Sequence, residues 1–309
     1  MDSFGPEEII LKKSLLADGA LLLVTMTWGL NFVVMKNALI KITPYLYLGI
    51  RFTMASLILA IIFNRQLRKL SKEELKGGLI IGLCVFMGFV TQTIGLLYTT
   101  PGKSGFITSI YVVLVPFLAF FLTKEFPGWF QILGAIVTFA GLGIISINED
   151  FTINIGDALT LLCAVAFALQ IIYTEQYVKK SNPINIAILQ TGVTGLLTMV
   201  MSFWLEPFPV TIDPMIWTAI LYAVIFCTAG AFAIQNIAQK YTSSTHAAVI
   251  MGMESVFAGL FSLIFWGETM TLRTLFGFSL IFGGVLITEL MPAIPPKPAD
   301  VRTLEEINK

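Results

Sequence analysis

Ten apolar segments of about 20 residues each dominate the sequence. A helix needs about 20 apolar residues to cross the hydrocarbon core of a bilayer, whereas a membrane-spanning strand is shorter and alternates in polarity. The segments therefore predict an all-α integral membrane protein with ten transmembrane helices. They lie at approximately 15–35, 43–63, 77–97, 104–123, 129–147, 157–177, 184–205, 215–237, 246–265 and 272–291.

The composition agrees with a membrane location. Hydrophobic residues make up 56% of the chain and charged residues 12%, whereas an ordinary soluble domain is roughly 25% charged. The formal net charge is zero, so no nucleic-acid partner is predicted. We expect tails at 1–14 and 292–309 and a charged surface helix within 64–76, which leaves no room for a separate soluble domain.

The second half of the chain repeats the first at an offset of 143 residues. The identical pairs are Gln92/Gln235, Ile94/Ile237, Tyr98/Tyr241, Thr99/Thr242, Glu125/Glu268, Gly134/Gly277, Phe139/Phe282 and Gly141/Gly284. Duplicated halves within a membrane are typical of alternating-access transporters. We therefore divide the chain into a first repeat, 15–147, and a second repeat, 157–291, with five helices each.

The basic residues predict the orientation of these helices. Of 19 Lys and Arg residues, 14 fall on the side of the membrane that carries both tails. The positive-inside rule places that side in the cytoplasm. Because five crossings is an odd number, the second repeat must run upside down relative to the first, which is an inverted five-plus-five repeat.

Three amides and one indole lie at membrane depth, where polar groups are costly unless they are partnered or solvated. Trp28 and Asn31 are three residues apart on the first helix and share one face. Gln92 and its repeat mate Gln235 lie at mid-depth in the third and eighth helices. They indicate a shared cavity near the repeat axis, and the alternative is a hydrogen bond between helices.

Arg51 and Glu254 are the strongest individual candidates because both are ionisable. Arg51 lies about two turns into the second helix, and its alternative role is to extend its charge to the membrane interface. Glu254 lies well inside the ninth helix, so its carboxylate must be protonated, paired or directed into a cavity. A structural pair with another helix is the alternative for Glu254.

No enzyme, metal site or cofactor site is predicted. The chain has one His, so neither an H-E-x-x-H site nor a site with several His ligands can form. Gly102-Lys103-Ser104 is similar to the end of a phosphate-binding loop, but Leu97 stands where that motif needs its first glycine. Glu125 and Glu268 are expected to cap helices or to pair locally.

Four segments resemble the EamA family, a branch of the drug/metabolite transporter superfamily. They are WGLNFVVMK (28–36), GIRFTMASLIL (49–59), YTTPGKSGFITSIYVVLVPFLAFFLTKE (98–125) and MESVFAGLFSLIFWGE (253–268). The resemblance runs from about residue 18 to residue 290. It implies ten helices in an inverted five-plus-five repeat, cytoplasmic termini, and a plasma (inner) membrane exporter or permease for amino acids, related metabolites or drugs.

The resemblance also assigns individual positions. Trp28 and Asn31 match a W-G-x-N pattern in the first helix, and Arg51 matches an Arg early in the second. Glu254 matches the Glu of a Glu-Pro-Val-Phe pattern, but Ser255 replaces the Pro. Because Pro is a common cause of helix kinks, this departure leaves open whether the ninth helix bends.

These observations predict a secondary transporter that moves a small amphipathic, amino-acid-like metabolite by alternating access. Its midplane site would be lined by Trp28, Asn31, Arg51, Gln92, Gln235 and Glu254. In this prediction Arg51 attracts a carboxylate, the amides bind polar groups, and Glu254 binds an amine or carries a proton. The alternatives are a passive facilitator or channel and a non-transport membrane assembly protein. Substrate identity, direction, coupling ion and the choice between monomer and homodimer are not determined by the sequence.

Overall fold

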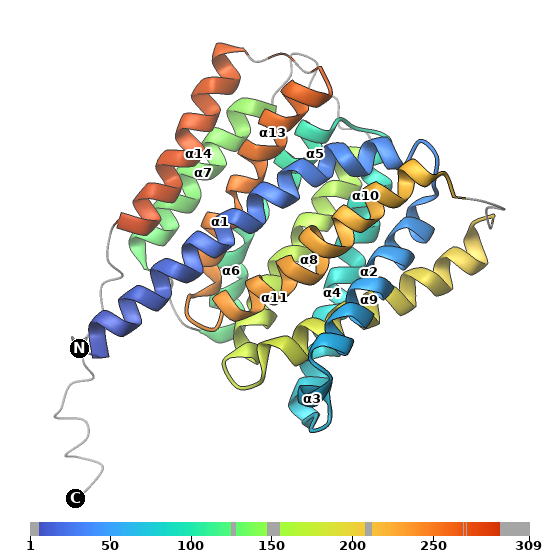
Figure 1. The fold of residues 1–309 in the computed structure, drawn as a ribbon. Coiled ribbons are helices and arrows are strands. Elements are labelled where there is room, and N and C mark those ends of the chain that lie inside the picture. Colours follow the sequence, from blue (N-terminus) through green and yellow to red (C-terminus); the bar gives the residue numbers. More distant parts are fainter. Residues whose placement is uncertain are drawn as a thin grey trace, which may run out of the picture.

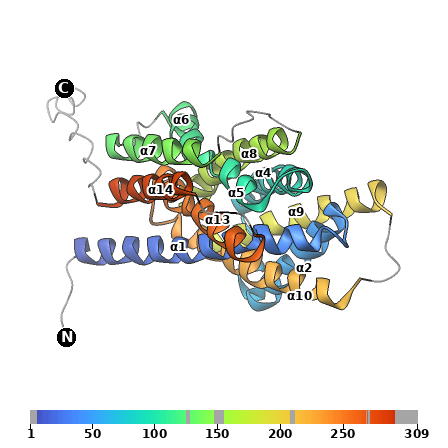
Figure 2. The same ribbon diagram turned by 90° about the horizontal axis from the view of Figure 1, so that it is seen from above.

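The structure, a computed structural model, describes residues 6–124, 128–146, 155–207, 212–267, 269 and 271–290. Every regular element in this part of the chain is helical. The predicted tail at 292–309, together with Glu125 and Glu268, lies outside the described residues. Figures 1 and 2 show the helices gathered in one bundle, with α1 running across it.

The helices follow the predicted order along the chain. They are α1 (Pro6–Ala38), α2 (Pro44–Ile62), α3 (Asn64–Leu67), α4 (Lys72–Leu97), α5 (Pro101–Thr108), α6 (Tyr111–Thr123), α7 (Trp129–Ser146), α8 (Ile155–Val178), α9 (Pro183–Leu205), α10 (Pro214–Val224), the π-helix η1 (Ile225–Gly230), α11 (Ala231–Ala238), α12 (Ser244–Met251), α13 (Met253–Phe265) and α14 (Leu272–Leu290). α1 begins at Pro6, inside the predicted tail, because Pro at a first helical position followed by Glu7 and Glu8 favours a helix start.

Eight helical stretches among the described residues are long and apolar enough to cross a membrane. They are Leu15–Ala38, Pro44–Ile62, Lys72–Leu97, Pro101–Leu122, Ile155–Val178, Pro183–Leu205, Pro214–Ala238 and Ser244–Phe265. Within α7 and α14 the apolar stretches are shorter, at Trp129–Gly141 and Leu275–Gly284. The all-helical fold is confirmed, and the count of ten crossings stays a prediction.

The fourth and ninth predicted helices are each interrupted at the same place in the repeat. α5 ends at Thr108 and α6 begins at Tyr111, while α12 ends at Met251 and α13 begins at Met253. Thr108 and Met251 are 143 positions apart (251 − 108), which is the offset of the sequence repeat. The two halves therefore share an irregular feature as well as their regular helices.

Gly252 lies at the second interruption, in a helix that has no proline there. A Cβ at Gly252 would lie 2.7 Å from Cγ2 of Val112 on α6, so glycine is needed for this close approach. Ser255, in the place of the family's Pro, donates from its Oγ to the carbonyl oxygen of Gly252 at 2.7 Å. The ninth predicted helix is therefore interrupted at a glycine, with a serine instead of a proline three residues later.

Counterpart helices of the two repeats pack against each other. α7 pairs with α14 and α2 pairs with α9, while α1 of the first repeat packs on α13 of the second, as α8 of the second repeat packs on α6 of the first. Figures 1 and 2 both show α7 and α14 side by side. A Cβ at Gly141 of α7 would lie 2.6 Å from the carbonyl oxygen of Gly277 on α14, so the two backbones touch. Equivalent surfaces of the two halves therefore meet at these contacts.

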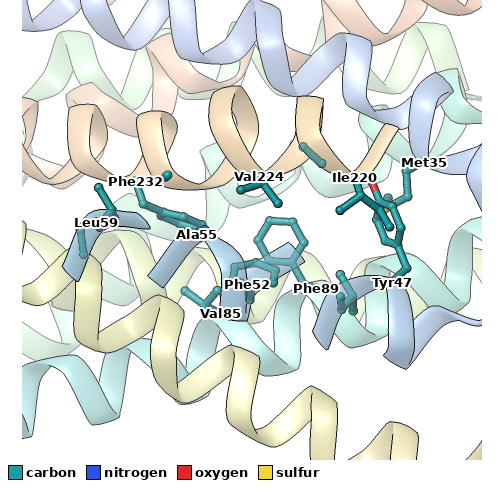
Figure 3. Close-up of a cluster of buried hydrophobic side chains, with 14 of the residues drawn as sticks. Met35, Tyr47, Phe52, Ala55, Leu59, Val85, Phe89, Ile220, Val224 and Phe232 are labelled. Atoms are coloured by element: carbon teal, nitrogen blue, oxygen red, sulfur yellow. The ribbon is translucent and has the colours of Figure 1, made fainter. Parts of the chain in front are cut away.

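Figure 3 shows a cluster of buried hydrophobic side chains, which includes the aromatic residues Phe52 of α2, Phe89 of α4 and Phe232 of α11. The rings of Phe52 and Phe89 meet edge to face, with centroids 4.9 Å apart. The ring of Phe89 also lies edge to face against Phe167 at 5.1 Å and Phe232 at 6.2 Å. Such contacts hold helices together in a bilayer, where hydrophobic burial gives no drive for association.

Candidate functional site

A cavity opens beside this aromatic cluster, with about 450 Å³ of space free of protein atoms, including the space at its opening. Its wall comes from α1, α4, α6, α8, α11, α12 and α13. The lining residues are Trp28, Asn31, Phe32, Phe89, Gln92, Tyr111, Phe167, Gln170, Ile171, Phe232, Met251 and Glu254. A concave, largely aromatic space with a few polar groups is the usual form of a small-molecule site.

The cavity lies between the two repeats. Phe89 and Phe232 both line it, and they are counterparts because their numbers differ by 143. Tyr111 and Glu254 are counterparts by the same arithmetic, and both line the cavity too. Equivalent positions thus face one space from opposite halves, as expected for a site at a repeat interface.

Glu254 places a carboxylate in the wall, in the first turn of α13. The residue is 5% exposed. Among the described residues, none gives its carboxylate a hydrogen bond or an ion pair. A buried carboxylate without a partner is costly at membrane depth, so this group needs a proton or a ligand from the cavity.

Asn31 is the second polar group of the wall without a partner. It is 5% exposed, and its Oδ1 has no hydrogen-bond partner among the described residues. Buried amides are normally hydrogen-bonded, so an amide left open on a cavity wall is available to an occupant.

The two glutamines of the repeat turn in different directions. Gln92 lines the cavity and donates from Nε2 to Oγ1 of Thr108 at 3.1 Å. Gln235 does not line it, and its Nε2 donates to Oε1 of Gln239 at 3.1 Å and to Oε1 of Gln170 at 3.3 Å. Of the two amides that were predicted to share a cavity, only Gln92 therefore lines it. The side chain of Gln235 does not line the cavity and is bonded to Gln170, which does.

The neighbours of the two glutamines explain this difference. The counterpart of Thr108 is Met251, which offers Gln235 only a weak sulfur acceptor. The counterpart of Gln170 is Thr27, whose hydroxyl donates to the carbonyl oxygen of Val24 instead. Each glutamine therefore turns toward partners from its own half, Gln92 toward Thr108 and Gln235 toward Gln170 and Gln239.

Arg51 is fully buried behind the cavity wall and does not line the cavity. Its Nε donates to Oγ1 of Thr228 at 2.6 Å, and its Nη2 donates to the carbonyl oxygen of Cys227 at 3.2 Å. Its Cζ lies 4.8 Å from the ring centroid of Phe89. The alternative role of Arg51, in which its charge extends to the membrane interface, is therefore wrong, because the guanidinium is bonded to the π-helix inside the bundle.

The π-helix η1 supplies the acceptors that hold Arg51. Oγ1 of Thr228 donates to the carbonyl oxygen of Ala223, five residues earlier, at 2.8 Å. The carbonyl oxygen of Cys227 also accepts the Nε1 hydrogen of Trp28 at 2.9 Å. The carbonyl group of Cys227 therefore accepts hydrogen bonds both from Trp28 in the cavity wall and from the buried Arg51 on α2. Such π-helical turns often occur at functional sites.

The family model described as "EamA-like transporter family" matches residues 15–147 and 154–290. The chain belongs to this family. An uncharacterized transporter of Archaeoglobus fulgidus is 35% identical over 278 residues, covering 90% of this chain and 87% of that protein. The uncharacterized transporter YvbV of Bacillus subtilis is 26% identical, covering 84% of this chain and 87% of the relative.

A solved structure supports the fold of this EamA-like transporter. It is described only as "Crystal structure of protein" and is 16% identical. It superposes with a TM-score of 0.73 and covers 89% of this chain and 96% of its own. The protein is therefore a multi-pass membrane transporter, which is not an enzyme class.

The structure of the EamA-like transporter brings four of the six predicted site residues to one cavity. Trp28, Asn31, Gln92 and Glu254 line it, whereas Arg51 and Gln235 stand behind it. Tyr111 was missed by sequence reasoning, although the offset applied to Glu254 leads directly to it. Gln170 was missed too, and its signal was a polar residue at mid-depth in the sixth predicted helix.

Two contacts between a basic and an acidic side chain join equivalent helices in the two repeats of this EamA-like transporter. Lys103 of α5 pairs with Asp157 of α8 at 2.7 Å, and His246 of α12 approaches Asp18 of α1 at 3.3 Å. Lys103 and His246 differ by 143 in number, and α1 is the counterpart of α8. The same contact between equivalent helices is thus built with a permanent cation in one half and a titratable group in the other.

Proposed function

We propose that the protein is a secondary transporter that moves a small amphipathic metabolite by alternating access, with the cavity between the repeats as its substrate site. Glu254 carries this proposal, because a carboxylate at membrane depth without a protein partner is explained by an occupant or by a transported proton. The aromatic wall and the open amide of Asn31 add the features of a site for a partly apolar molecule.

The membrane arrangement that goes with this proposal has ten helices. α7 and α14 serve as the fifth and tenth crossings of an inverted five-plus-five repeat, with both termini in the cytoplasm and the protein in the plasma membrane. The shared interruptions and the pairing of α2 with α9 and of α7 with α14 support two halves related by a two-fold axis. Such halves can exchange their conformations, which opens the cavity to each side in turn.

Each wall residue receives a role in this mechanism. Trp28 and its neighbouring rings contact the apolar body of the substrate. Asn31 and Gln92 bind its polar groups, and Glu254 binds an amine or carries a proton when transport is coupled to a proton gradient. Arg51 and Gln235 position the wall instead of touching the substrate, since both are held by bonds behind it.

The test begins with ligand binding to the purified full chain. A panel of amino acids, nucleosides, amines and organic acids is screened for a rise in Tm, because a ligand that binds only the folded state must stabilise it. Hits are then followed as saturable flux into liposomes. Glu254→Gln should remove both responses, whereas Glu73→Gln, at an exposed position of α4, should leave them unchanged.

Two results would overturn the proposal. One is a panel without any stabilising ligand or flux from well-folded protein, and the other is full transport by the Glu254→Gln variant. Flux that does not saturate with concentration would instead indicate a passive facilitator.

A further inference from the structure

The cavity wall carries a negative group and no positive one. Glu254 contributes a carboxylate, and none of the described residues that line the cavity is a Lys, Arg or His. We propose that the substrate is an organic cation: an amine or quaternary ammonium ion with an apolar or aromatic body and no carboxylate of its own. This inference rests on the proposed function and narrows its substrate class.

The carboxylate of Glu254 supplies the charge that such a cation needs. An ammonium group beside it would satisfy both ions at once, whereas either ion buried alone would be costly. The open Oδ1 of Asn31 is an acceptor on the same wall and can take an N–H of a protonated amine. Carboxylate and amide oxygen are thus both acceptors, and both suit a donor that carries positive charge.

The aromatic rings of the wall fit a cation as well. Six of the lining residues are aromatic, and the faces of such rings attract ammonium groups within about 6 Å of their centroids. Phe89 already has the guanidinium of Arg51 at 4.8 Å from its centroid. Trp28, Phe167 and Phe232 have no such guanidinium against them among the described residues, so they remain for the substrate.

A substrate carboxylate, in contrast, has no counter-ion in this cavity. Arg51, the cation predicted to bind one, is bonded to Thr228 and Cys227, packs behind the ring of Phe89 and does not line the cavity. A carboxylate in the cavity would therefore meet the like charge of Glu254 without compensation. This separates simple amines from amino acids, which carry both charges.

The experiment compares four molecules that share one apolar body: phenethylamine, its N-acetyl derivative, phenylalanine and 3-phenylpropionate. A second set with an indolylethyl body tests a larger size, and a quaternary ammonium form of each amine separates charge from N–H donation. Affinity is measured on the purified full chain by displacement and by the rise in Tm. The amine and its quaternary form should bind at least tenfold more tightly than the other three.

Variants test whether Glu254 is the group that binds the positive charge of the substrate. Glu254→Gln should weaken the amine at least tenfold and leave the neutral N-acetyl derivative unchanged, while Glu254→Asp should restore part of the loss. The exposed Glu73→Gln variant is the matched control for the removal of one negative charge. A size-exclusion profile equal to that of the parent shows that each variant is folded.

Three outcomes would overturn the inference. The first is phenylalanine binding as tightly as phenethylamine with a loss in Arg51→Lys, which would assign a carboxylate to Arg51. The second is equal binding of the neutral derivative and the amine. The third is no binding of any amine in either set. In each case the proposed transport function is decided separately by saturable flux of the wider panel.

Discussion

The two repeats share their backbone but differ in chemistry at equivalent positions. Tyr111 in the first half faces the cavity where Glu254 faces it from the second. Both residues follow a helix interruption that begins at the equivalent position in each half. The comparison teaches that the duplicated scaffold provides the position of the site, while single substitutions within it provide the charge.

The largest expected effect tests this difference directly. Glu254→Gln should lower transport at least a hundredfold, because it removes the only carboxylate among the described lining residues. Tyr111→Phe, which removes a hydroxyl from the equivalent position, should lower transport less than tenfold. Saturable flux into liposomes at equal protein content measures both. Equal losses in the two variants would contradict a division of roles between the halves.

The second effect concerns stability at the equivalent positions 51 and 194. Arg51→Lys should lower the free energy of unfolding by about 1.5–3 kcal/mol, because an ammonium cannot reproduce the fork that reaches Thr228 and Cys227. Thr194→Val should cost about 1 kcal/mol, since its Oγ1 bonds only carbonyl oxygens. Unfolding in detergent with increasing denaturant gives both values. A milder effect at Arg51 than at Thr194 would show that the π-helix is held by other contacts.

The third effect tests the contact of α7 with α14. Gly284→Ala should cost about 1–3 kcal/mol, because its Cβ would stand against Oγ1 of Thr138 and 2.6 Å from the carbonyl oxygen of Gly134. Gly283→Ala is the matched control, since nothing lies within 4 Å of a Cβ there. The control should be neutral or slightly stabilising, because alanine favours a helix more than glycine does. The Tm values of the two variants measure this difference in stability. Identical values would argue against a close contact between the backbones of α7 and α14.

The smallest effect compares the caps of equivalent helices. Asp213 caps α10 and lies 2.6 Å from Lys41, while the hydroxyl of Ser71 caps α4. The hydrogen bond from Lys41 lowers the pKa of Asp213 below its ordinary 3.8. A lowered pKa in the folded state means that the contribution to stability is complete above 3.8 and is lost as the pH falls through the lowered pKa.

Asp213→Asn should therefore reduce the fall of Tm between pH 5 and pH 2 slightly, and added salt should reduce it in the parent, because the pair is exposed. Ser71→Ala should leave the pH dependence unchanged. A larger change from Ser71→Ala than from Asp213→Asn would contradict this assignment.

Much of this architecture follows from patterns that local physics makes visible. Apolar length predicts the membrane fold, and the cost of polar groups at depth singles out six residues. Trp28, Asn31, Gln92 and Glu254 line the cavity, whereas Arg51 and Gln235 do not. Their roles in binding stay predictions.

The orientations of Gln235 and Arg51 depend instead on hydrogen-bond partners that are distant in sequence. Nothing near Gln235 shows that Gln170 will accept its amide, because 65 residues separate them. The direction of Arg51 is set by the π-helix, 176 residues away at Cys227. A helical pattern gives the face of a residue but not the hydrogen-bond partner that decides where a long side chain turns.

The pairing of α7 with α14 and of α2 with α9 has a consequence for the origin of the chain. A contact between counterpart elements is isologous: the same surface meets its own copy, as in a symmetric dimer. The arrangement of the chain therefore resembles that of such a dimer, with the two copies joined in one polypeptide. In a homodimer, the positions that correspond to 111 and 254 would carry the same residue, so the cavity would contain either two carboxylates or none. Because the two copies are joined in one chain, the cavity can contain a single carboxylate.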